Sequence, residues 1–232
     1  VTNDTWKLQT LANSLPNSGG TISLPADSDY TINSPLLLKS NVILEGNNCR
    51  LIANNALNNS VIRNSQINLG NENIRINNLR IAGNRTNQSH TANPAHGIAF
   101  YSSSNILIEN VTIDDVELDG IYFGGTVAST ISSVVVGSFC SNIVVRNCTI
   151  TNCYRNGVSL TNTRYAEIYN ITASANNKGV PSNSGRYLAA TIDLEPNDGT
   201  DHCFEIYIHD CDITADNAPA IGIQGSSNKD RC

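Results

Sequence analysis

The chain has 232 residues, of which 15% are charged, and its formal net charge is −6. This length suits one sizeable hydrophobic core. The sparse Lys and Arg residues form no cluster, which excludes the basic footprint of a nucleic-acid-binding protein. No apolar run approaches the 18 residues of a membrane span. Abundant Asn, Ser, Thr, Val and Ile are typical of strands and tight turns, so the composition predicts an all-β protein.

The first predicted element is a helix over residues 4–15. Its apolar residues recur at helical spacing, and they are Trp6, Leu8, Leu11 and Leu15. Asp4 or Thr5 can cap its start, and the segment 16–20, rich in Gly, Pro and Asn, ends it. Short segments that alternate apolar with polar residues follow at 19–26, 30–32 and 35–46. We interpret the helix as a cap over the first coil of a solenoid.

From residue 73 onward two short phrases alternate along the chain. A nine-residue phrase that begins Asn-Ile occurs at 73–81, 105–113 and 142–150, with weaker copies at 167–172 and 205–213. A small residue followed by two apolar residues, one position apart, occurs at 96–100, 119–123, 156–160, 190–194 and 219–223. A repeat of roughly 23 to 40 residues built from short strands predicts a solenoid, in which equivalent positions stack into columns.

One column of this repeat consists of corner residues. Its members are Asn78, Asn110, Asn147, Asn170 and Asp210. Asn and Asp tolerate the left-handed backbone conformation, and stacked Asn side chains can bond to backbone between coils. We therefore interpret these residues as structural.

The seven cysteines also fall into columns. Cys148 and Cys211 share an inward position, and we expect Ile171 between them, so the two sulfurs would be two coils apart. That separation, near 9.6 Å at about 4.8 Å per coil, is too long for a disulfide. Cys140, Cys203 and Cys232 share a second column, and we expect mostly free thiols.

The last residue, Cys232, stands where another strand phrase would begin. We expect residues 1–18 to form the capping helix and residues 19–232 to form a parallel β-helix that is truncated at its C-terminal end. The alternative is that another chain covers this end, because an open solenoid end would aggregate.

The segment 5–46 resembles the start of pectate-lyase-like, right-handed parallel β-helix proteins. The resemblance rests on the Leu8-Gln9 pair of the helix, on Gly19-Gly20-Thr21, and on the phrase from Pro35 to Ser40. The family includes polysaccharide lyases, polygalacturonase-like hydrolases, alginate epimerases and many phage tailspikes. The phrase at 192–197 (IDLEPN) is similar to one in tailspike-like and epimerase-like members. The resemblance implies a single-stranded, right-handed parallel β-helix with an N-terminal capping α-helix.

Several activity motifs of that family are missing here. The paired Asp-Asp and Gly-His-Gly motifs of polygalacturonases are absent, as is the Asp-Pro-His-Glu motif of alginate epimerases. We also expect no Arg in the cleft column, where classical pectate lyases would require one. The resemblance therefore implies a fold without assigning a reaction.

The short strands define an outward face on which we expect the chemistry. Its central column is predicted to contain Ala99, Tyr122, Ser159, Asp193 and Gly222. Asp193 and Glu195 alternate with inward residues, so both are expected to point outward from one strand, roughly 7 Å apart. Two carboxylates at this spacing fit inverting glycoside hydrolysis, and one alone fits proton abstraction in a lyase. An equally simple interpretation is that they only solvate the surface.

Other residues of this face are candidate supporting groups. We expect Asp119 as a third catalytic candidate, although it can equally cap a turn. The substrate-binding candidates are Tyr122, Tyr101, His96, Ser159 and Asn156, with the tyrosines as flat surfaces for sugars. Arg155 and Arg186 flank the face and could pair with an acidic glycan.

A calcium site is the alternative for the carboxylates. Asp198 and Asp201 follow Glu195 closely, and four carboxylates within nine residues offer the oxygen ligands that Ca²⁺ takes. We expect no other cofactor, because no His pair has zinc spacing.

The sequence and the resemblance together give two hypotheses. The first is an extracellular polysaccharide-active protein of the phage tailspike depolymerase type, which cleaves glycan by hydrolysis or β-elimination. The second is a non-catalytic structural or glycan-binding β-helix of a viral tail appendage or secreted adhesin. In both the partner is a polysaccharide, with no nucleic acid and no membrane span, and the location is outside the cell or on the virion tail. The resemblance adds a homotrimer.

Overall fold

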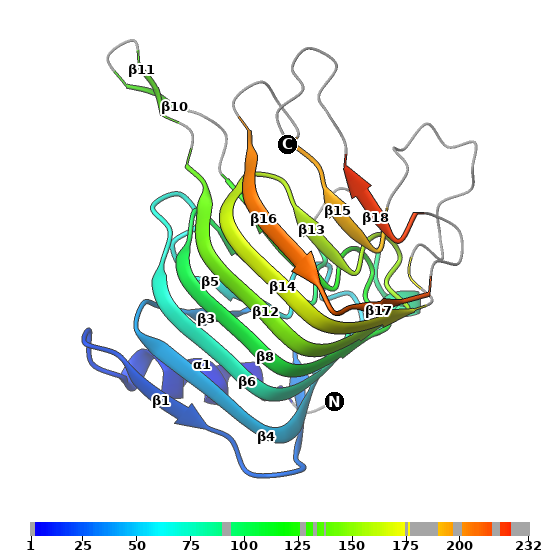
Figure 1. Cartoon of the computed structure of the whole chain (residues 1–232). Coiled ribbons are helices and arrows are strands. Elements are labelled where there is room, and N and C mark those ends of the chain that lie inside the picture. The colour runs from blue at the N-terminus through cyan, green and yellow to red at the C-terminus, as the bar shows by residue number, and fades with distance from the viewer. Residues whose placement is uncertain are drawn as a thin grey trace.

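The computed structural model describes residues 3–89, 94–125, 129–131, 134–136, 138–174, 176, 190–196, 201–214 and 219–223. The chain winds into a parallel β-helix whose coils stack from β4 to β16, with the helix α1 at the end next to β3 (Figure 1). This architecture confirms the fold that the repeat predicts.

Two parallel sheets form the walls of the solenoid. The long-strand sheet consists of β1 (Gly20–Ser23), β2 (Asp29–Ile32), β4 (Val42–Ala53), β6 (Glu72–Ala82), β8 (Ser104–Asp114), β12 (Cys140–Thr151), β14 (Thr163–Ser174), β16 (Cys203–His209) and β17 (Asp212–Ile213). The short-strand sheet consists of β3 (Leu36–Leu38), β5 (Ile62–Asn64), β7 (Ile98–Tyr101), β9 (Ile121–Gly124), β13 (Val158–Leu160), β15 (Ile192–Leu194) and β18 (Ile221–Ile223).

Two smaller elements lie outside these sheets. A 3₁₀ turn, η1, spans Arg85–Asn87, and an antiparallel hairpin joins β10 (Ser129–Ile131) to β11 (Val134–Val136). Among the described residues, no helix has the length and apolar character needed to cross a membrane.

Stacked asparagines make the bends of the long strands. The predicted corner residues have φ values of 51° to 55°, and they are Asn78, Asn110, Asn147, Asn170 and Asp210. We expected the Asn amides to bond to backbone, but here they bond to side chains of the next coil. For example, Asn110 Nδ2 donates to Asn78 Oδ1 at 3.1 Å. A second such column, which the repeat analysis missed, contains Asn41, Asn73, Asn105 and Asn142. In the second column the side chains thus satisfy one another from coil to coil.

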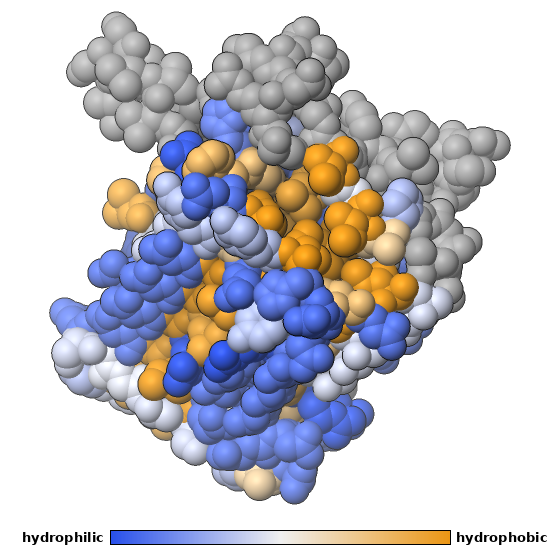
Figure 2. All heavy atoms as spheres, viewed as in Figure 1, coloured by the Kyte–Doolittle hydropathy of each residue, from blue (hydrophilic) through white to orange (hydrophobic). Residues whose placement is uncertain are grey.

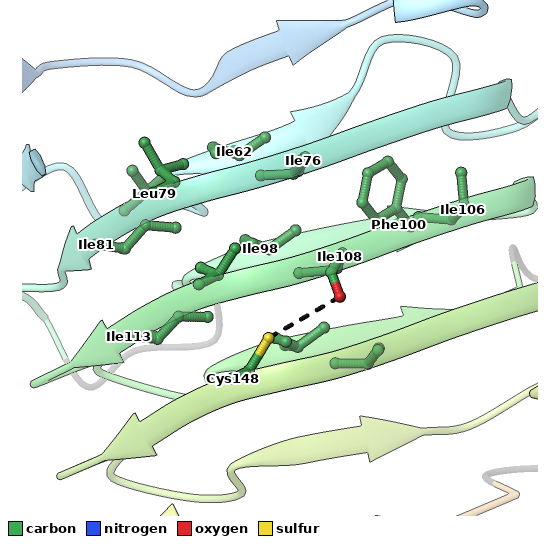
Figure 3. Close-up of a cluster of buried hydrophobic side chains, with 14 of the residues drawn as sticks. Ile62, Ile76, Leu79, Ile81, Ile98, Phe100, Ile106, Ile108, Ile113 and Cys148 are labelled. Carbon is green, nitrogen blue, oxygen red and sulfur yellow. Dashed lines mark hydrogen bonds between the residues drawn. The ribbon is translucent and has the colours of Figure 1, made fainter. Parts of the chain in front are cut away.

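The core lies between the two sheets and consists mainly of Ile, Leu and Val. Figure 3 shows Ile62 and Ile98 of the short strands facing Ile76 and Ile108 of the long strands, all fully buried. Cys148 belongs to this core, and its thiol lies 3.9 Å from the Ile108 carbonyl oxygen (Figure 3). Burial raises the pKa of Cys148 to about 12, so it behaves as a small apolar residue.

The six described cysteines form no disulfide with one another, in agreement with the expectation of mostly free thiols. Thr163 separates Cys140 from Cys203 in the register of the long strands, so these two residues lie two coils apart. Cys232 lies outside the described residues.

The helix α1 (Thr5–Ser14) covers the first coil, as expected, but with a different face. Leu8 and Ala12 are buried, whereas Trp6 and Leu11 are 61% and 50% exposed. Gln9 turns toward β3, where its amide accepts from the Leu37 N–H at 2.8 Å and donates to the Leu37 carbonyl at 3.1 Å. These two bonds satisfy the open backbone edge of the short-strand sheet.

The outermost described coil exposes apolar side chains at the other end of the stack. Phe204 on β16 is 52% exposed, and Ile221 and Ile223 on β18 are 44% and 66% exposed. Figure 2 shows hydrophobic residues gathered at this end, beside the hydrophilic bands of the long-strand face.

Candidate functional site

The candidate site lies on the outer face of the short-strand sheet, where the register fixes the predicted column. Ala99 pairs with Tyr122, Tyr122 with Ser159, Ser159 with Asp193, and Asp193 with Gly222. The repeat therefore predicted correctly which outward side chains are neighbours in space.

The same column contains an arginine, which contradicts the expectation that it holds none. Arg63 of β5 pairs with Ala99, so it extends the column by one coil toward the helix. Val61 stands where the other copies have a small residue, and the polar Asn64 stands at the second core position. The short-strand phrase therefore did not reveal Arg63. A usable signal existed, because Ile62 precedes Ile98 by 36 residues, which matches the length of the repeat.

Asp193 is more enclosed than expected of an outward carboxylate. Its side chain is 1% exposed, and its Oδ2 accepts from Asn156 Nδ2 at 3.4 Å. Asn156 is itself buried, and its Oδ1 accepts from the Ala190 N–H at 3.1 Å. Asp193 is therefore bound into the neighbouring coil, which corrects the interpretation that it only solvates the surface.

Ser159, between Tyr122 and Asp193, is also buried. Its hydroxyl oxygen has no hydrogen-bond partner among the residues that the structure describes. The hydroxyl thus remains available as a polar group beside Asp193 on the same face.

Asp119, on the turn before β9, is fully buried and paired with Arg155. The guanidinium binds both carboxylate oxygens, with Nε donating to Oδ1 at 2.8 Å and one terminal nitrogen donating to Oδ2 at 2.5 Å. The Asn156 N–H also donates to Oδ1, at 3.1 Å. Burial alone would raise the pKa of Asp119, but the Arg155 charge overcomes it and holds that pKa well below its usual range. Asp119 is therefore ionised and fixed.

His96 lies against the same carboxylate. Its Nδ1 is 3.2 Å from Asp119 Oδ2. Burial lowers the pKa of His96, and the Asp119 charge offsets only part of that shift, so the imidazole is neutral at pH 7. The ring stacks on Tyr122, with centroids 4.6 Å apart and planes 15° apart.

Tyr122 forms the aromatic centre of the face. Its hydroxyl lies 3.0 Å from Thr161 Oγ1, and its ring lies 5.4 Å from that of Tyr101. Gly124 makes room for it, because a Cβ at that position would lie 2.5 Å from the Tyr122 hydroxyl. Burial raises the pKa of Tyr122 to about 12, so the phenol keeps its proton. Both tyrosines remain partly exposed and can meet a sugar ring.

Glu195, just beyond β15, is the partly exposed carboxylate of the site. Its N–H donates to the Leu160 carbonyl at 2.8 Å, which fixes its backbone to the preceding coil. Burial raises the pKa of Glu195, the Arg155 charge opposes this rise, and the Asp119 charge adds to it. Glu195 therefore holds a proton more readily than an ordinary glutamate.

The expected calcium ligands are described only in part. Asp198 and Arg186 lie outside the described residues, whereas Asp201 is described. Within the described segments, no three His, Cys, Asp or Glu side chains are grouped as metal ligands.

A family model described as the right-handed β-helix region matches residues 96–231. Among solved structures, the tailspike protein of E. coli bacteriophage HK620 in complex with pentasaccharide aligns with a TM-score of 0.68 at 19% identity, over 96% of this chain and 37% of that one. The pre-mature gene product 12 of bacteriophage phi29 aligns with a TM-score of 0.64 at 18% identity, over 83% of this chain and 25% of that one.

A third similar structure is a protein from Parabacteroides merdae designated a candidate glycosyl hydrolase. Its TM-score is 0.65 at 16% identity, over 91% of this chain and 88% of that one. The chain thus spans a quarter to two fifths of the two phage proteins and most of the bacterial one. No curated protein matches the sequence.

Proposed function

The chain belongs to the right-handed β-helix family, and we propose that its short-strand face binds a polysaccharide and cleaves it by hydrolysis. The observation that carries this proposal is a pair of carboxylates on β15 and just beyond it, where Glu195 is partly exposed and Asp193, two residues before it, is buried. The pKa of Glu195 is raised, whereas that of Asp119 is held low by Arg155. A carboxyl with a raised pKa is typical of a general acid at neutral pH. Asp119 stays ionised and holds Arg155 and the Asn156 N–H.

In this proposal Glu195 is the general acid. It gives its proton to the glycosidic oxygen as the bond from that oxygen to the anomeric carbon breaks. Its raised pKa keeps the proton available, and its partial exposure lets a sugar approach. A raised pKa suits an acid better than a base, so we favour hydrolysis over β-elimination.

Asp193 is the second carboxylate in this mechanism. Because it is buried, a single water can reach it more readily than a sugar ring can. Asp193 would take a proton from that water as the oxygen attacks the anomeric carbon from the face opposite the leaving group. Attack from that face inverts the configuration of the anomeric carbon.

The remaining residues position these groups and the substrate. Tyr101 and Tyr122 offer their rings to the sugar, and Tyr122 is held by His96 and Thr161. The Arg155–Asp119 pair fixes Asn156, which in turn holds Asp193. Asp119 is therefore a positioning residue in this proposal, whereas the sequence made it a catalytic candidate.

The similar structures support a glycan as the partner. One of them is a tailspike protein in complex with pentasaccharide, and another is designated a candidate glycosyl hydrolase. Two come from bacteriophages, which supports a place on a virion tail or elsewhere outside the cell. A homotrimer remains part of the proposal on the family resemblance alone.

A glycan depolymerisation screen tests the proposal. It would compare the wild-type chain with Glu195→Gln and Asp193→Asn on acidic and neutral polysaccharides, and it would measure new reducing ends and the absorbance of unsaturated uronates. We expect reducing ends without that absorbance, and a loss of about 10²- to 10⁴-fold in rate for Glu195→Gln. Glu72→Gln, an exposed carboxylate change on the long-strand sheet, is the matched control.

A non-catalytic glycan-binding β-helix is the second candidate. The observation that favours it is that Asp193 and Asp119 are both buried and engaged, which leaves only Glu195 of the three partly exposed. Binding of a glycan that is never cut, with the same affinity in wild type and Glu195→Gln, would establish this alternative.

A further inference from the structure

The column of the candidate site begins with a basic residue that the proposed mechanism does not use. Arg63 is the outward residue of β5, between Leu37 of β3 and Ala99 of β7 in the register. Ile62 and Asn64 on either side of it point into the solenoid and are fully buried. The backbone therefore fixes Arg63 on the same face as Tyr122 and Asp193.

Among the described residues Arg63 forms no ion pair, in contrast to several other arginines. Its Nε is buried and has no hydrogen-bond acceptor within the described part of the chain. By contrast, Arg155 binds Asp119, Arg146 binds Glu109 and Arg50 binds Asp29. Leaving a buried donor of a charged group unpaired is unfavourable, so such a group indicates a missing acceptor.

The surroundings of Arg63 suit an anion. Burial raises the pKa of Tyr101, and the nearby Arg63 charge opposes that rise, so the phenol stays protonated beside the guanidinium. The register supports the same neighbourhood, because Arg63 pairs with Ala99, and Tyr101 follows Ala99 by two residues on the same strand. A guanidinium matches the two oxygens of a carboxylate in its planar, two-point geometry.

We propose that Arg63 and Tyr101 form a subsite for the carboxylate of an acidic sugar, so that the substrate is an anionic polysaccharide. This inference rests on the proposed function of the same face. Four strand-to-strand steps separate Arg63 from Asp193, through β7, β9 and β13. At about 4.8 Å per step the two residues are roughly 19 Å apart along the column. The acidic sugar therefore lies several units away from the bond that is cleaved.

The first test uses a probe that needs no knowledge of the natural glycan. Sodium D-glucuronate and D-glucose are titrated into the wild-type chain at equal ionic strength, and the NMR signals of the Ala99 methyl group and the Tyr101 ring are followed. We expect both signals to shift with glucuronate and not with glucose, and the shift to vanish in Arg63→Gln. Arg80→Gln, which removes an exposed charge from the long-strand sheet, should retain it. Unchanged signals, or equal shifts with both sugars, would overturn the subsite.

The second test separates the subsite from the proposed function. On an acidic glycan that the chain cleaves, Arg63→Gln should raise KM about 10- to 100-fold with kcat little changed, because one charged hydrogen-bonding partner is lost. Cleavage of neutral glycans alone, with Arg63→Gln as active as wild type, would refute the subsite and leave the function. Glucuronate bound at Arg63 without cleavage of any glycan would refute hydrolysis and leave the subsite.

Discussion

Replacing Asp119 with Asn tests whether the buried pair with Arg155 organises the site. Asp119 is fully buried, whereas the Arg155 side chain is 33% exposed. The substitution keeps the shape of the side chain but removes the charge that two guanidinium nitrogens and the Asn156 N–H now share. Removing one partner of a fully buried pair costs about 3 to 5 kcal/mol. Because Arg155 can reach water, we expect a smaller loss of about 2 to 3 kcal/mol in the free energy of unfolding.

A matched substitution on the other sheet shows what an ordinary ion pair contributes. Glu109 accepts from Arg146 at 2.5 Å on the outer face of the long-strand sheet, where both side chains touch solvent. Glu109→Gln should cost about 1 kcal/mol or less, as is typical of surface pairs. Urea unfolding followed by circular dichroism, with the m-value checked for each variant, measures both losses. Equal losses for Asp119→Asn and Glu109→Gln would refute the argument.

The pH dependence of the same variant gives an independent check. The pKa of Asp119 is lowered in the folded chain, so its carboxylate stabilises the fold at every pH above the unfolded value near 4. That stabilisation is lost as the pH falls below about 4 toward the folded value. The difference in stability between wild type and Asp119→Asn should therefore be constant above about pH 5 and shrink in more acidic solution. A difference that stays constant down to pH 3 would contradict an ionised, paired Asp119.

Three further predictions concern single contacts of the fold. Gly124→Ala should displace the Tyr122 ring, because the new Cβ would lie 2.5 Å from the Tyr122 hydroxyl. Thermal unfolding should show that the free energy of unfolding falls by about 1 to 3 kcal/mol, and the affinity for glycan should also fall. Gln9→Ala removes the side-chain partner of both backbone groups of Leu37. Hydrogen exchange at the Leu37 amide should therefore accelerate at least tenfold. Unchanged exchange would show that α1 does not protect this edge. Asn110→Ala should lose about 1 to 2 kcal/mol because Asn110 has a φ of 55°, whereas Asn110→Gly should lose less, and the reverse order in urea unfolding would contradict the role of the left-handed backbone.

The sequence predicted those features of the fold that repeat from coil to coil. The outward column from Ala99 to Gly222 follows from the spacing of the short strands, because backbone pairing between coils forces equivalent positions together. The corner at Asn110 was predicted for the same reason, since each coil presents the same chemistry at that position. Arg63 was missed because its strand lacks the small residue that marks the other copies.

The sequence predicted less well how enclosed each side chain is. Asp193 is expected to be exposed from strand alternation alone, yet it is buried against Asn156 of the neighbouring coil. Alternation tells which face of the strand a residue occupies but not which turns pack over that face. The pairing of Asp119 with Arg155 was missed for the same reason, because the two residues lie on turns of adjacent coils, 36 residues apart.

The column that runs from Arg63 to Asp193 draws each of its side chains from a different coil. Backbone hydrogen bonds and buried side chains on either side of the outward position join the coils. These contacts do not depend on which side chain occupies the outward position. An outward residue can therefore be exchanged in one coil while the backbone pairing of the neighbouring coils is kept. The ligand that such a surface binds can therefore change through substitutions at outward positions, without a change in the fold. This independence explains how the chain can share its fold with phage and bacterial proteins to which it is less than 20% identical.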